Sequence, residues 1–152
     1  MSSRGLTLVE LLFVLLIGTI LTVIALPLIT NVMGTYRLRA AVSSVAGAIQ
    51  TTRYQAISSG CRYQLVLKKA ASTFQVQSAP DPNNPTVFAN VGGTVPLASS
   101  SIPVVLGADT TLQFRPSGVV AATVGAQTLT LTYQGKTETI TVSSYGTIKV
   151  TP

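Results

Sequence analysis

The chain has 152 residues, 47% hydrophobic and only 9% charged, whereas a soluble domain usually carries about 25% charged residues. This length allows one domain with a core. Histidine is absent and the four acidic residues lie far apart in the sequence, so we expect no enzyme activity, no metal and no cofactor. Cys61 is the only cysteine, which excludes an intrachain disulfide. The net charge of +6 comes from scattered basic residues and permits contact with lipid head groups or nucleic acid.

The first element is an apolar stretch over residues 6–29, preceded by the short, polar and positively charged residues 1–5. As a helix, this stretch would rise about 36 Å, which is enough to cross a hydrocarbon core of about 30 Å. A positive flank of this kind stays in the cytoplasm. The sequence therefore predicts a single-pass transmembrane helix over 6–29, and a plain membrane anchor is its simplest interpretation.

Glu10 argues against a plain anchor. An ionisable group within an apolar membrane segment costs up to about 2.5–3.5 kcal/mol, and such groups usually have a partner and a function. The sequence has no other charged residue between Arg4 and Arg37. The partner of Glu10 must then be a backbone or terminal group, or another molecule.

Residues Arg4 to Leu12, RGLTLVELL, closely resemble the class III signal of type IV pilins and type II secretion pseudopilins. The resemblance implies that residues 1–5 are a leader, that a prepilin peptidase cleaves between Gly5 and Leu6, and that the new amine of Leu6 is methylated. Leu6 stands where phenylalanine is more usual. The resemblance also implies a bacterial inner-membrane protein with a cytoplasmic N-terminus and a periplasmic C-terminal domain, which an assembly platform in that membrane builds into a pilus or pseudopilus.

Removal of the leader would create a partner for Glu10. Cleavage would create a positively charged α-amine at the head of the helix. If a neighbouring subunit offers that amine to Glu10, two charges that are costly in lipid satisfy each other, and the pair sets the stagger between packed helices. We therefore expect Glu10 to act in subunit assembly, together with other pilins or pseudopilins and the surrounding membrane lipid.

A second helical segment is expected over 30–59. Pro27 removes one helical hydrogen bond and should kink or locally melt the helix, at a place where many pilins have a helix-breaking proline. Beyond it, apolar residues recur at alternating steps of four and three, which predicts an amphipathic helix with one buried face. Gly60 is the expected C-cap, and Arg53 is expected to be solvated. The buried stripe comprises Leu38, Val42, Val45, Ile49, Thr52 and Ala56.

Over residues 60–152, short segments alternate between apolar and polar side chains, as strands do. We expect strands over 63–67, 73–77, 112–115, 128–133, 139–142 and 147–150, with a tight turn at 134–136. Prolines and a Gly-Gly pair predict a long loop over 78–101. The expected fold class is α+β and pilin-like: a long N-terminal helix, transmembrane in its first half, packed on a C-terminal antiparallel β-sheet domain.

The C-terminal half resembles one branch of the superfamily. In H-type minor pseudopilins and FimT-type minor pilins, a Phe-x-Pro-x-Gly turn opens a terminal hairpin, and a short strand that begins at a glycine ends the chain. Phe114–Gly118, the 128–142 hairpin and Gly146–Val150 stand in those places. The resemblance implies a minor subunit that helps to start or cap a filament.

Two alternatives stay open. Some FimT-type pilins are implicated in DNA uptake through a basic Gly-Arg-x-Arg tail, and the matching segment here, Gly146 to Lys149, has one basic residue. If they gather on one face, Arg115, Lys136 and Lys149 are the candidate DNA contacts. A major pilin is the other alternative, although the absence of a cysteine pair counts weakly against it.

Overall fold

The computed structural model describes residues 7–81, 84–97 and 104–152, without the side chains of residues 25–31. The chain divides into two compact units, Met1–Thr35 and Tyr36–Pro152. Helix α1 is helical from Leu8 to Ser59 and therefore crosses the boundary between the units. Gly60 follows with a φ of +67°, the left-handed conformation that ends many helices.

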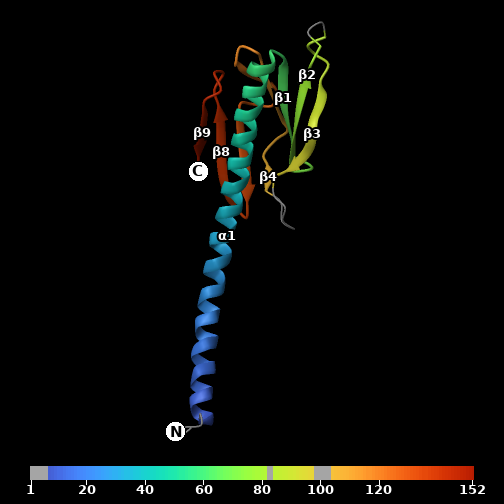
Figure 1. The fold of residues 1–152 in the computed structure, drawn as a ribbon. Coiled ribbons are helices and arrows are strands. Elements are labelled where there is room, and N and C mark those ends of the chain that lie inside the picture. The colour runs from blue at the N-terminus through green and yellow to red at the C-terminus, as the bar shows by residue number, and fades with distance from the viewer. Residues whose placement is uncertain (1–6, 82–83, 98–103) are drawn as a thin grey trace. The chain divides into compact units, whose positions relative to one another are not determined.

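Unit 2 contains two antiparallel sheets beside the C-terminal half of α1 (Figure 1). In the part of the chain that the structure describes, the five-stranded sheet has the order β3-β2-β1-β5-β6 and the four-stranded sheet has the order β4-β7-β8-β9. The strands are β1 (Arg62–Lys68), β2 (Thr73–Ala79), β3 (Ala89–Pro96), β4 (Val105–Leu106), β5 (Thr110–Phe114), β6 (Val120–Val124), β7 (Thr128–Tyr133), β8 (Lys136–Val142) and β9 (Ile148–Thr151).

One hydrophobic core holds the helix and both sheets of unit 2 together. Every residue of the predicted helical stripe is buried, which confirms the expected face. Alternate strand residues complete the core, among them Leu65, Phe114 and Ile140, each with no exposed surface. Full burial of one such side chain contributes about 1.5–3 kcal/mol, so the stripe fixes the position of the helix on the sheets.

A hydrogen bond between side chains also joins the helix to a strand. The Arg37 guanidinium donates a hydrogen bond to the hydroxyl of Tyr133, at 2.9 Å, and so joins the helix to the end of β7. The turn between β7 and β8 consists of Gln134 and Gly135, both with positive φ, as the tight turn predicted for this hairpin requires.

The expected loop over 78–101 is wrong over Ala89–Pro96, which forms β3. This strand lies at the edge of the five-stranded sheet and is largely exposed, so it lacks the apolar alternation that marks a half-buried strand. Its pairing with β2 is irregular between Phe74 and Val76. Gly92 and Gly93 are typical of such an irregularity. The same Gly-Gly pair led to the prediction of a loop here. The short β4 and β6 were also not predicted.

Candidate assembly and binding sites

Thr7 caps the N-terminus of α1. The backbone N–H of Glu10 donates to the hydroxyl of Thr7, at 3.3 Å, and the N–H of Leu11 donates to the Thr7 carbonyl, at 3.2 Å. A threonine followed three residues later by a glutamate is the sequence signature of a capping box. Thr7 was not predicted as a functional residue, although this signature is visible in the sequence.

The carboxylate of Glu10 is exposed and has no hydrogen-bond or ion-pair partner in the part of the chain that the structure describes. An acidic group in the first turn of a helix also interacts favourably with the helix dipole. The carboxylate can therefore accept a partner from outside the chain without losing a contact within it.

Unit 1 presents apolar surface along its described length. Every large apolar side chain from Leu8 to Ile24 is exposed, between 53% at Leu11 and 76% at Leu8. The hydroxyls of Thr19 and Thr22 donate to backbone carbonyls one turn earlier, so these polar groups are satisfied within the helix. Among the residues that the structure describes, no helix combines the length and the apolar character needed to cross a membrane.

Three predicted positions concern cleavage and helix geometry. Gly5 and Leu6, the predicted cleavage and methylation positions, lie outside the described residues. Helix α1 is assigned without interruption through position 27, so Pro27 does not end the helix. A kink at Pro27 stays a prediction.

The three candidate DNA contacts do not lie together. Lys136 pairs with Tyr133 at the start of β8, whereas Lys149 of β9 pairs with Thr141. Thr141 lies five positions after Lys136 on β8, about 17 Å away along the strand, and alternation turns the two side chains to opposite faces. Arg115 follows β5 in the other sheet. The single face on which these residues were expected to gather is therefore not formed by the two lysines.

Arg53 is half-buried rather than solvated as expected, because it joins α1 to two turns. Its Nε donates to the carbonyl oxygen of Gly118, at 3.0 Å. A Cβ atom built on Gly146 would lie 2.6 Å from the Cδ of Arg53, so the side chain occupies the space that the glycine leaves open. Both glycines have positive φ, +80° at Gly118 and +78° at Gly146.

The contacts of Arg53 explain two glycines of the C-terminal motifs. Gly118 closes the turn after Phe114, with its N–H donating to the Arg115 carbonyl at 2.8 Å. The N–H of Val120 then donates to the Ser144 carbonyl, at 2.8 Å, which links this turn to the one before β9. The Phe-x-Pro-x-Gly turn and the glycine before the last strand thus meet at the C-terminal end of α1.

Among the described residues, no three or more histidine, cysteine, aspartate or glutamate side chains form a group that could hold a metal ion. Cys61 is half-buried and has a free thiol.

Comparisons with known proteins agree with this architecture. The family model for the type II transport protein GspH matches residues 41–146. The fold is similar to that of the minor pseudopilin EpsH from the type 2 secretion system of Vibrio cholerae, with a TM-score of 0.57 and 12% identity over 76% of this chain and 96% of that chain. No curated protein sequence shows significant similarity to the chain.

The matched segment includes residues 41–59 of α1 and both motif turns that meet at Arg53. The family match and the fold confirm the pilin and pseudopilin superfamily, and its H-type branch, that the sequence predicted. The chain belongs to the GspH family of type II transport proteins.

Proposed function

We propose that this chain is a minor pseudopilin that helps to start or cap the filament of a type II secretion system or a related type IV pilus. It inserts its N-terminal helix among the helices of neighbouring subunits and presents its β-domain at the filament surface. Membership of the GspH family supports this role, and the apolar surface of unit 1 is the observation that carries it.

The exposed apolar surface of unit 1 must be shielded from water by lipid or by another protein. Every large apolar side chain from Leu8 to Ile24 is more than half exposed, and a soluble protein rarely leaves so much contiguous apolar surface in water. Lipid before assembly and neighbouring helices after assembly would both cover it. In this role the segment over 6–29 spans the inner membrane, with residues 1–5 in the cytoplasm and the β-domain in the periplasm.

Glu10 is the residue that would direct packing within this apolar surface. Prepilin peptidase would cut between Gly5 and Leu6 and methylate Leu6, which leaves a positively charged amine on each mature subunit. The Glu10 carboxylate has no partner among the described residues, so a neighbour's amine would complete it. The assembly platform of the inner membrane would supply the work of extraction.

The other candidate functions have less support. The two lysines proposed as DNA contacts lie on opposite faces of their sheet, and phosphate binding depends on clustered cations. DNA binding through Arg115, Lys136 and Lys149 therefore rests on the resemblance to FimT-type pilins. A major pilin role differs from the proposed one in abundance, and the family match favours the minor role.

Glu10→Gln tests the assembly role. Glutamine also serves at this position of a capping box, so the helix start should survive while the charge is lost. We expect normal amounts of the variant in the membrane but at least about tenfold less in sheared filaments, because an unpaired charge among packed helices costs about 3–5 kcal/mol. Immunoblots of the two fractions measure the ratio.

Thr7→Ala is the matched control, since it removes the cap hydroxyl and keeps the charge. Loss of a cap costs only about 0.5–2 kcal/mol, so this variant should still enter filaments. Normal incorporation of Glu10→Gln would contradict a role for the charge, and failure of Thr7→Ala beside it would show that filament entry depends on the helix cap instead.

A further inference from the structure

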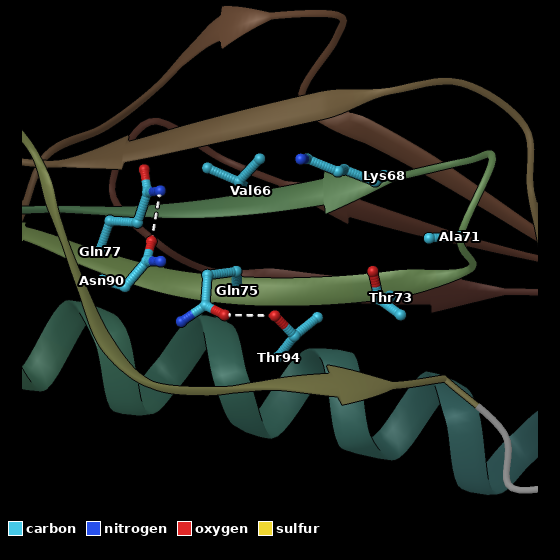
Figure 2. A pocket seen from close by; sticks show the side chains of 8 residues that line it. All are labelled: Val66, Lys68, Ala71, Thr73, Gln75, Gln77, Asn90 and Thr94. Carbon is cyan, nitrogen blue, oxygen red and sulfur yellow. Dashed lines mark hydrogen bonds between the residues drawn. The ribbon is translucent and has the colours of Figure 1, made fainter.

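A pocket of about 360 Å³ lies on the five-stranded sheet and is lined by side chains from β1, the following turn, β2 and β3 (Figure 2). Its polar lining residues are Lys68, Thr73, Gln75, Gln77, Asn90 and Thr94. The volume is within the range of small-ligand sites, about 300–1,000 Å³. Neither the proposed assembly role nor the core of unit 2 uses this surface.

The amide oxygens in the pocket already accept hydrogen bonds from neighbouring strands. Gln64 Nε2 donates to Gln77 Oε1 at 2.5 Å, and Gln77 Nε2 donates to Asn90 Oδ1 at 2.8 Å. The hydroxyl of Thr94 donates to Gln75 Oε1, at 2.7 Å. Figure 2 shows the last two of these bonds as dashed lines within the pocket. The network therefore occupies an acceptor on each amide that lines the pocket.

Two nitrogen groups left over are hydrogen-bond donors, and the hydroxyl of Thr73 can donate or accept. The Nδ2 amide of Asn90 and the ammonium of Lys68 have no partner in the part of the chain that the structure describes. Together they offer five N–H groups, two from the amide and three from the ammonium. Lys68 is the one charged residue in the lining, so the site favours a ligand that is rich in acceptors and negatively charged.

The spacing of these donors sets the length of the ligand. Lys68 of β1 pairs with Thr73 and Asn90 of β3 pairs with Gln77, on opposite sides of β2. The two donors therefore lie four positions apart along β2, about 13 Å, and two strand spacings apart across the sheet, about 10 Å. We infer that the pocket binds an extended acidic peptide segment of another protein, with a carboxylate at Lys68 and backbone carbonyls at Asn90.

Other ligand classes fit less well. Nucleic acid is held by several phosphate contacts from basic residues, and the lining offers a single cation among neutral polar and apolar side chains. A second copy of this chain is disfavoured, because the protein has ten basic and only four acidic residues. The unpaired Nδ2 amide of Asn90 can donate to a backbone carbonyl of an extended peptide.

Fluorescence anisotropy of the full-length chain in detergent micelles tests the site. The probe is a labelled tetrapeptide of two aspartates and two glycines, and the reference probe has asparagines in place of the aspartates. We expect the acidic probe to bind and Lys68→Gln to weaken it about tenfold or more, as loss of a hydrogen bond to a charged group does. Asn90→Ala should weaken both probes by a smaller factor.

Lys69→Gln is the matched control, because this exposed neighbour carries the same charge and lies outside the pocket. Binding of the acidic probe should be unchanged by Lys69→Gln, and circular dichroism should show all variants folded. If Lys69→Gln weakened binding of the acidic probe as much as Lys68→Gln, the effect would come from the general positive charge of this surface, and the proposed site would be wrong. Absence of binding, equal binding of both probes, or tighter binding of a short DNA duplex that ignores Lys68→Gln would overturn it as well.

Discussion

Arg53 contacts two turns that are far from it in the sequence. Its side chain donates a hydrogen bond to Gly118 in the turn after β5 and packs against Gly146 in the turn before β9, and these turns belong to different sheets. The Phe-x-Pro-x-Gly pattern was visible in the sequence, but its partner was not, because 65 residues separate Arg53 from Gly118. Contacts of that range depend on how the strands are ordered, which a local pattern does not specify.

Gly146→Ala should destabilise unit 2 by about 1–3 kcal/mol. The alanine would adopt a positive φ that costs about this much, and its Cβ would lie 2.6 Å from Arg53 Cδ. Thermal unfolding followed by circular dichroism measures the change. Gly93→Ala is the control, since no atom lies within 4 Å of the added Cβ and its φ is not in the left-handed region.

Combining Gly146→Ala with Arg53→Ala should cost less than the sum of the two single changes, because the alanine at position 53 removes the clash. Strict additivity would mean that the two residues do not meet.

At the scale of elements, the helix was easier to predict than the sheets. The period of its apolar residues identified the buried face, and the burial of Leu38 through Ala56 confirms it. The half-buried strands β7 and β8 were also predicted, since their residues alternate cleanly. The edge strand β3 was missed because exposure removes the alternation on which such a prediction depends.

Ile49→Ala should destabilise unit 2 by about 2–5 kcal/mol, as expected when a fully buried isoleucine leaves a cavity. Ile49 has no exposed surface, whereas Ile57 on the same helix is 47% exposed. The matched change Ile57→Ala should cost about 1 kcal/mol or less, because less apolar area returns to water. Chemical unfolding of both variants in the same detergent compares them, and equal costs would contradict the assigned helix face.

At the scale of the whole molecule, the superfamily followed from one short motif, whereas the candidate binding sites did not. The RGLTLVELL segment indicated the pilin and pseudopilin superfamily, and the family match confirms it. The register of the strands decides instead where the basic residues lie and which side chains line the pocket on the five-stranded sheet. A shift of one residue in a strand turns each side chain to the other face, so residue spacing in the sequence could not show which cations share a surface.

The central claim is that this chain is processed as a pilin and enters a filament. Mass spectrometry of sheared filaments tests it most directly, because one measurement reports the presence, the abundance and the N-terminus of the chain. The expected result is a minor component that begins at an N-methylated Leu6. A chain that retains Met1 and is absent from the filament fraction would contradict the claim.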